Sequence, residues 1–204
     1  MVIDDPDALV ARALALVAGG RRAILGIAGP PGGGKSTLAE TVVAALGDRA
    51  VLVPMDGFHI AQPELVRLGR RDRMGAPDTF DAAGYVALLA RLRSQDDEVV
   101  YAPAFRREIE EPVAGAIAVG PGVRLVVTEG NYLLLWDAVR PLLDEAWYVE
   151  MDEATRLEWL TARHVEFGKT PDEAGEWVKR SDQANAAVVA ATRERADVVV
   201  RLAT

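Results

Sequence analysis

The chain has 204 residues, of which 50% are hydrophobic and 26% are charged, a composition typical of one globular domain with a sizeable core. Its net charge of −8 argues against non-specific nucleic-acid binding, which depends on Lys and Arg contacts with phosphates. The absence of cysteine excludes disulfides, thiol catalysis and cysteine-ligated zinc, and no apolar run approaches the ~18 residues of a membrane span.

The first half of the chain predicts a helix, a strand and a second helix in that order. The acidic stretch 1–7 lacks the basic start of a signal peptide, so we expect a cytoplasmic protein without a membrane partner. An amphipathic helix is predicted over 8–18. The apolar run 23–28 is typical of a buried parallel strand, and residues 38–46 predict a helix that Gly47 ends.

Between that strand and that helix lies Gly29-Pro30-Pro31-Gly32-Gly33-Gly34-Lys35-Ser36-Thr37, which fits the phosphate-binding pattern G-x-x-x-x-G-K-[ST]. Glycines let backbone N–H groups approach phosphate oxygens, and the helix N-terminus adds unpaired donors and partial positive charge. We therefore expect residues 29–37 to bind the phosphates of ATP or GTP. Lys35 is expected on the β- and γ-phosphates and Ser36 on Mg²⁺.

The rest of the chain alternates between predicted strands and predicted helices. Strands are predicted at 51–55, 98–102, 116–119, 123–128, 146–151 and 196–202. Helices are predicted at 63–68, 81–93, 132–143, from Asp152 to about 167, and from the capping box Thr170-Pro171-Asp172-Glu173 onward. Residues 70–77 and 103–112 are expected to form loops. This alternation predicts an α/β fold, residues 1–204, with a mostly parallel sheet covered on both faces.

Two acidic residues follow predicted strands directly. Ligands of open parallel sheets bind beyond the carboxyl ends of the strands, where the P-loop also lies. Asp56, after strand 51–55, is therefore expected to accept a proton from a substrate hydroxyl. Glu129 ends an apolar strand, as in the Walker B pattern, and is expected to orient Mg²⁺.

Two arginines on the predicted helix 152–167 are candidates to bind the phosphoryl group that is transferred. Arg156 and Arg163 are seven residues apart and share a helix face. Because Gly168 breaks the helix, we expect residues 158–177 to form a small helical lid whose closure carries Arg163 to the γ-phosphate. Lys169 is a weaker candidate, and His164 is expected on the helix surface.

The acceptor is expected between Asp56 and two loops, 70–77 and 101–107. Polar side chains are dense in these loops, which follow strands whose ends face the P-loop. The side chains expected to contact the acceptor are His59, Arg73, Tyr101 and Arg107.

These motifs resemble the phosphoribulokinase, uridine kinase and pantothenate kinase group of P-loop kinases. The region after the second strand is similar to type I pantothenate kinases at Asp56-Gly57-Phe58, Gly69, Arg73, Gly75, Pro77, Phe80 and Asp81. Short members described as kinases linked to fructose transport are most similar, at 55–58, 75–81, 112–117 and 129–134. Met74 departs from the pantothenate kinase pattern, where a lysine is expected. The resemblance implies a three-layer α/β/α P-loop fold and a preference for adenine.

The sequence thus predicts an ATP- and Mg²⁺-dependent kinase that phosphorylates a hydroxyl of a small metabolite. A sugar-like alcohol is the first choice of acceptor, and a nucleoside or a pantothenate-like alcohol is the second. A regulatory P-loop ATPase without a small acceptor is the alternative. The sequence disfavours a GTPase and an ABC-type ATPase, because it contains neither N-K-x-D nor a stretch like L-S-G-G-Q. A homodimer is left open.

Overall fold

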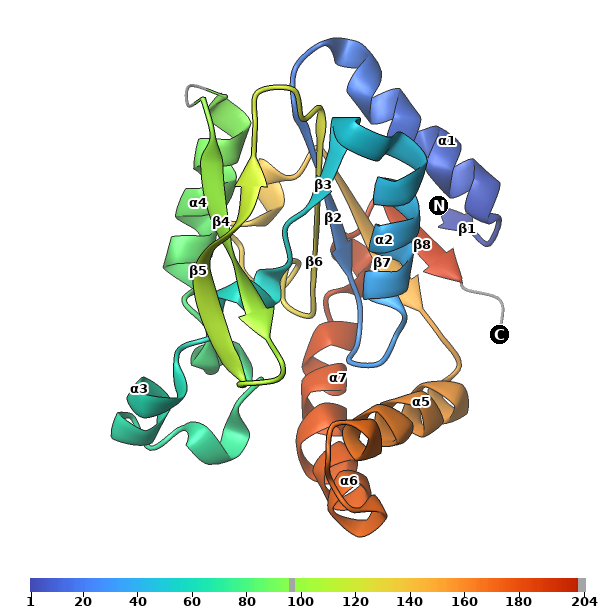
Figure 1. The fold of residues 1–204 in the computed structure, drawn as a ribbon. Helices are drawn as coiled ribbons and strands as arrows, with labels where there is room; N and C mark the ends of the chain where they lie inside the picture. The colour runs from blue at the N-terminus through green and yellow to red at the C-terminus, as the bar shows by residue number, and fades with distance from the viewer. Residues whose placement is uncertain (96–97, 202–204) are drawn as a thin grey trace.

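The computed structural model describes residues 1–95 and 98–201 (Figure 1). Within these ranges, six strands form one parallel sheet in the order β1-β8-β7-β2-β6-β3, and two more form a separate antiparallel hairpin, β4-β5. The strands are β1 Val2–Ile3, β2 Ala23–Ala28, β3 Ala50–Leu52, β4 Val100–Arg106, β5 Glu111–Val119, β6 Leu125–Gly130, β7 Glu145–Glu150 and β8 Val198–Arg201.

Helices cover both faces of the sheet, so the predicted three-layer α/β/α fold is confirmed (Figure 1). The helices are α1 Pro6–Leu16, α2 Lys35–Leu46, α3 Gln62–Arg67, α4 Ala82–Ser94, α5 Glu153–Glu166, α6 Pro171–Trp177 and α7 Gln183–Ala190. A π-helical turn, Val178–Asp182, joins α6 to α7. None of the helices in the described ranges combines the length and apolar character that crossing a membrane requires.

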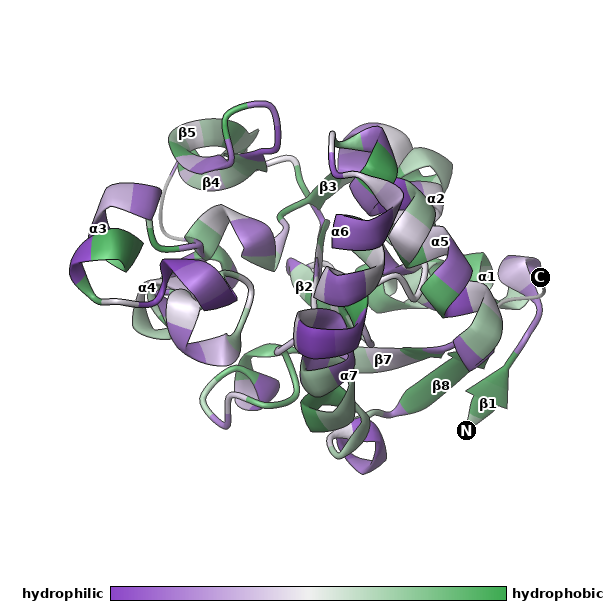
Figure 2. Cartoon of the chain, turned by 90° about the horizontal axis from the view of Figure 1, so that it is seen from below, coloured by the Kyte–Doolittle hydropathy of each residue, from purple (hydrophilic) through white to green (hydrophobic). Residues whose placement is uncertain are grey.

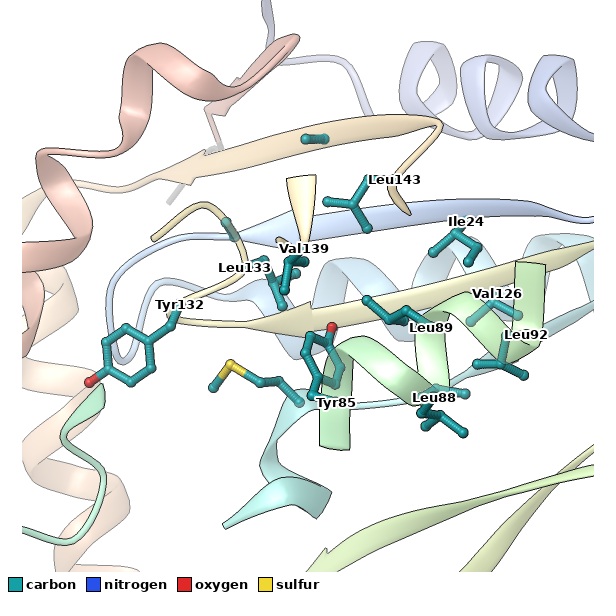
Figure 3. Close-up of a cluster of buried hydrophobic side chains, with 14 of the residues drawn as sticks. Ile24, Tyr85, Leu88, Leu89, Leu92, Val126, Tyr132, Leu133, Val139 and Leu143 are labelled. Carbon is teal, nitrogen blue, oxygen red and sulfur yellow. The ribbon is translucent and has the colours of Figure 1, made fainter. Parts of the chain in front are cut away.

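Side-chain alternation along the central strands builds two apolar cores. In β2, Leu25 and Ile27 face α1 and α2, whereas Ile24 faces α4 on the opposite side. All six residues of β2 are buried, which explains why it reads as a continuous apolar run instead of an alternating one. Figure 3 shows the second core, where Leu89 and Leu92 of α4 point toward Ile24 and Val126.

Side-chain caps set the starts of several helices. Asp81 accepts a hydrogen bond from the backbone N–H of Gly84, and Asp152 accepts one from Thr155. Thr170 and Glu173 form a complete capping box with Pro171 at the first helical position. The sequence-based predictions at Asp152 and Thr170 are confirmed, and Gly168 between α5 and α6 has a positive φ of 97°.

The order of the strands determines which loops meet. β6 pairs with β2 on one side and with β3 on the other, so the carboxyl ends of the three lie together. The P-loop follows β2, Glu129 is the partner of Ile27 at the end of β6, and Asp56 follows β3 after a short connection. β7, on the far side of β2, leads directly into α5.

Two local predictions were wrong, the helix 132–143 and the loop 103–112, whereas the strands predicted at 98–102 and 196–202 are present. The predicted helix 132–143 is a series of turns with a short 3₁₀ helix, Arg140–Leu142, because Tyr132, Leu133 and Leu134 all turn into the core. The predicted strand 98–102 begins β4 of the separate hairpin, which also takes up most of the predicted loop 103–112. The last predicted strand, 196–202, is β8, and its final residue Leu202 lies outside the described residues.

The hairpin approaches the segment after β3 more closely than a side chain would permit. A Cβ on Gly57 would lie 2.4 Å from the carbonyl oxygen of Pro103 in β4. On the other side, a Cβ on Gly130 would lie 2.5 Å from the Cβ of Met55. Glycine at these two positions lets β6 and the hairpin enclose the Met55–Phe58 turn.

We predict that Gly57→Ala lowers the free energy of unfolding by about 1 to 3 kcal/mol, because the backbone of Pro103 must move to make room. The measurement is urea denaturation. Gly175→Ala is the matched control, since no atom lies within 4 Å of its added Cβ and the site is helical. The control should stabilise the protein by roughly 0.5 to 1 kcal/mol. Equal midpoints for Gly57→Ala and the parent protein would contradict the tight packing.

Candidate active site

A cleft of about 450 Å³ opens at the carboxyl ends of β2, β6 and β3. The P-loop and the Met55–Phe58 turn form its floor. The turn between β4 and β5 forms one wall, and α5 to α7 form the other. The lid segment, which we define as residues 158–177, contributes Arg163 and Phe167 to this second wall. In Figure 2, α6 is predominantly hydrophilic, in contrast to the hydrophobic strand β8.

The P-loop wraps the start of α2 and packs tightly on its surroundings. Gly32 and Gly34 have positive φ angles of 74° and 82°, and Gly34 is the N-cap of α2. A Cβ on Gly29 would lie 2.8 Å from the carbonyl oxygen of Val149, and one on Gly32 would lie 3.1 Å from the Cβ of Leu160. The helix N-terminus therefore faces the cleft with free backbone donors, as phosphate binding requires.

Lys35 and Glu129 form a buried pair of opposite charges, each 8% exposed. Burial lowers the pKa of Lys35 to about 8, while the charges of Glu129 and Asp56 act in the opposite direction. Burial, and then the negative charge of Asp56, raise the pKa of Glu129 above its ordinary value, with Lys35 partly offsetting them. The Lys35 ammonium donates to the Pro30 carbonyl at 2.9 Å.

Asp56 lies across the cleft floor from the P-loop with its carboxylate 32% exposed. The preceding Val53 is bound to β6 twice: its N–H donates to Val127 at 2.8 Å, and its carbonyl accepts from the Thr128 hydroxyl at 2.7 Å. This fixes Asp56 relative to Glu129. Arg107, from the β4–β5 turn, lies 3.6 Å from the Asp56 carboxylate.

Ser36 and Glu129 provide oxygen atoms suitable for a magnesium ion. The Ser36 hydroxyl donates to the Glu129 carboxylate at 3.1 Å, so the two predicted ligands already lie together. Among the described residues, no group of three or more His, Cys, Asp or Glu side chains forms a self-contained metal site. Mg²⁺ in kinases needs no such site, because it is held by one or two protein oxygens together with substrate phosphates and water. The donor set therefore fits Mg²⁺.

The two arginines of α5, Arg156 and Arg163, have different environments. Arg163 lines the cleft, where burial and the charge of Arg107 lower its pKa while Asp182 raises it. Arg156 is 4% exposed and donates to the Pro31 carbonyl of the P-loop at 3.1 Å, as well as to Gln183 of α7. Arg156 thus fastens the stem of α5 to the P-loop, whereas Arg163 faces the space above it.

The residues expected at the acceptor end separate into two groups. His59 and Arg107 line the cleft. The His59 ring lies between Phe80 and Phe105, with centroid distances of 4.0 and 4.6 Å. Arg73 lies outside the cleft lining, paired with Asp78 at 2.5 Å, and Tyr101 is on the outer face of the hairpin, 60% exposed.

Sequence reasoning missed a polar cluster on the helical wall. His164, expected on the helix surface, is partly buried in the cleft and lies 2.8 Å from the carboxylate of Asp182 in the π-helical turn. Asn185 follows one turn later and also lines the cleft. The available signal was the spacing of Asp182 and Asn185, two polar residues on one face of a segment rich in Ala and Val.

No protein-family model matches the chain. A Schizosaccharomyces pombe protein named "Putative uridine kinase C227.14" is 33% identical over 214 aligned positions, which cover 98% of this chain and 91% of that protein. The crystal structure of a "putative fructose transport system kinase" from Silicibacter sp. TM1040 superposes with a TM-score of 0.87 at 34% identity, covering 96% of this chain and 98% of that one. Pantothenate kinase of Nocardioides sp. is 26% identical over 72% of this chain and 49% of its own length.

The depressed pKa of Lys35 predicts that nucleotide binding takes up a proton. Without ligand, the ammonium loses its charge as pH rises through about 8. Bound phosphates favour the charged form of Lys35, so a non-hydrolysable ATP analogue should bind with proton uptake at about pH 8.5. The affinity for the analogue should fall as the pH rises further. Calorimetry in two buffers of different ionisation enthalpy measures this. Lys35→Arg keeps the charge and should abolish the uptake; uptake that persists in this variant would assign the proton to another group.

The anchoring of Arg156 predicts where lid motion begins. We expect residues 163–177 to exchange amide hydrogens faster than the sheet without ligand, and to slow when an ATP analogue and acceptor bind. Residues 153–157 should be protected in both states, because Arg156 ties them to the P-loop. Hydrogen exchange read by mass spectrometry tests both statements. Equal protection of 163–177 with and without ligands would contradict a closing lid.

Proposed function

Since this chain belongs to the phosphoribulokinase, uridine kinase and pantothenate kinase group of P-loop kinases, we propose that it transfers the γ-phosphate of ATP to a hydroxyl group of a small metabolite. One observation supports this most strongly. A partly exposed carboxylate, Asp56, lines the same cleft as a P-loop lysine, Lys35, and an arginine of the lid segment, Arg163. A regulatory ATPase requires no carboxylate at that place.

In this proposal Asp56 is the general base. The acceptor oxygen attacks the γ-phosphorus, its proton passes to an Asp56 carboxylate oxygen, and the bond between the γ-phosphorus and its bridging oxygen breaks, leaving ADP. Arg107, 3.6 Å from Asp56, places a positive charge beside this carboxylate at the edge of the cleft. His59 stabilises the turn, because its ring Nδ1 lies 2.8 Å from the Asp56 carbonyl oxygen.

Positive charge for the transferring phosphoryl group comes from two directions. Lys35 approaches from the P-loop and Arg163 from the lid segment. Lys35 is buried and Arg163 is partly buried, and the electrostatic effect of a charge is larger where it is shielded from bulk water. The side chain of Arg163 has no hydrogen bond or ion pair with another residue in the described part of the chain, which leaves its guanidinium available. Mg²⁺, held by Ser36 and Glu129, would supply further neutralisation of phosphate charge.

The acceptor is expected to be a sugar-like alcohol, with a nucleoside or pantothenate-like alcohol as the second choice. The aromatic rings of Phe80, Phe105 and His59 supply an apolar surface, and polar side chains surround it. Pantothenate kinase is less similar to this chain than the uridine kinase-like relative, and Met74 stands where its pattern has lysine. The greater similarity to the uridine kinase-like relative favours a sugar or a nucleoside over pantothenate as the acceptor.

We predict that Asp56→Asn retains binding of an ATP analogue and loses about 10²- to 10⁴-fold in kcat for acceptor phosphorylation. Asn is nearly isosteric and can still hold a hydroxyl group, but it cannot take the proton. The measurement combines phosphorylated product by mass spectrometry with analogue binding by calorimetry.

Asp72→Asn is the matched control, because Asp72 is exposed in the neighbouring loop and does not line the cleft; its turnover should equal that of the parent. Near-parental transfer by a folded Asp56→Asn protein would remove Asp56 as the base. ATP consumption that no acceptor stimulates would favour the regulatory ATPase.

A further inference from the structure

Asp182 is a nearly buried carboxylate that the proposed phosphoryl transfer does not use. It is 8% exposed, lines the cleft opposite Asp56, and places one oxygen 2.8 Å from His164 Nε2. Its second oxygen has no hydrogen-bond partner among the described residues. Among the described residues, every completely buried side-chain oxygen or nitrogen atom has a hydrogen-bond partner. An oxygen of Asp182 without a partner is therefore not completely buried, and it reaches the open space of the cleft.

Asn185 repeats this arrangement one helical turn away. It is also 8% exposed, and its side-chain N–H donates to the Gly75 carbonyl at 3.3 Å, which leaves its amide oxygen without a partner in the described part of the chain. The Tyr132 hydroxyl donates to the same Gly75 carbonyl at 2.6 Å. These bonds connect α7 to the 70–77 loop, so the wall belongs to the acceptor end of the cleft.

The π-helical turn is the reason that both acceptor oxygens face the cleft. A π-helical turn inserts residues relative to an α-helix and changes which side chains share a face. Here Lys179 and Arg180 remain exposed, whereas Asp182, at the end of the turn, and Asn185 are buried in the cleft wall. Such turns are frequently found at functional sites.

The cleft therefore presents two hydrogen-bond acceptors on one wall and aromatic rings near Asp56. We propose, given the kinase function above, that Asp182 and Asn185 bind hydroxyl groups of the acceptor other than the one phosphorylated. The acceptor is then a polyhydroxylated molecule, either a free sugar or polyol or the sugar of a nucleoside. His164 acts as a positioning residue that holds the Asp182 carboxylate in place.

A counter-charge role for Asp182 toward Arg163 is the competing explanation, since the two groups interact electrostatically. That role does not account for Asn185, which is neutral and tied to the Gly75 loop. In the described residues, no hydrogen bond or ion pair joins Asp182 to Arg163. A counter-charge role therefore gives no reason for the second carboxylate oxygen of Asp182 to face the cleft. The two roles differ in what they affect: acceptor affinity in the first case, the phosphoryl-transfer rate in the second.

The first experiment measures ADP release and product mass with MgATP and six probes: D-fructose, D-ribose, xylitol, uridine, pantothenate and n-propanol. We expect turnover with at least one of the first four, and the ribose and uridine arms distinguish a free sugar from a nucleoside. Turnover only with pantothenate or n-propanol would overturn this inference and leave the kinase function standing. A failure of all six would contradict both.

The second experiment compares the best probe with its deoxy analogue in the parent protein and in Asp182→Ala. The variant should raise KM for the probe by about 10- to 100-fold, the usual effect of a lost hydrogen bond to a charged group, with ATP-analogue affinity unchanged. It should also lose the discrimination between probe and analogue. Asp182→Asn, which keeps one acceptor oxygen, should show a smaller rise and serves if the alanine variant does not fold.

Two outcomes separate the explanations. A fall in kcat with unchanged KM in Asp182→Ala would assign Asp182 to Arg163 and overturn the proposal. Retained discrimination against the deoxy analogue would overturn it as well. Glu176→Gln is the matched control, because Glu176 is exposed on α6 outside this cleft, and its KM should equal that of the parent.

Discussion

Two carboxylates and one ammonium meet at the carboxyl ends of β2, β6 and β3, and the rest of the site is arranged around this cluster, in which Lys35 and Glu129 are buried and Asp56 is partly exposed. Burial moves Lys35 and Glu129 toward their neutral forms, while their mutual attraction opposes that change. Asp56 adds a second negative charge. Two carboxylates beside a single lysine leave an excess of negative charge that a bound divalent cation would balance.

Segments outside the parallel sheet build the walls around this corner. The β4–β5 hairpin reaches the Met55–Phe58 turn only because Gly57 has no side chain, and it brings Arg107 to Asp56. On the other side, Arg156 fastens α5 to the P-loop, so the lid segment extends from a fixed stem. The sheet thus supports phosphate chemistry, and the added segments shape the space for the second substrate.

The two walls meet across the mouth of the cleft. Arg107 lies over the ring of Phe167, 5.8 Å from its centroid, while it also faces Asp56. Asn185 and Tyr132 both bind the Gly75 carbonyl and so connect the helical wall to the loop after α3. These contacts join the helical wall to the β4–β5 turn beside Asp56 and to the loop after α3.

Local sequence determined the P-loop and the helix caps at Asp152 and Thr170, because each of these depends on a few contiguous residues. The carboxyl-end rule brought Asp56 and Glu129 to the same edge without knowledge of strand order. Tertiary structure alone decided the rest. A register shift between Ala102 and Ala104 separates the outward-facing Tyr101 from Phe105 in the cleft, although the two are an even number of residues apart. Burial in the core turned 132–143 away from a helix, and the π-helical turn placed Asp182, because packing partners distant in sequence fix these conformations.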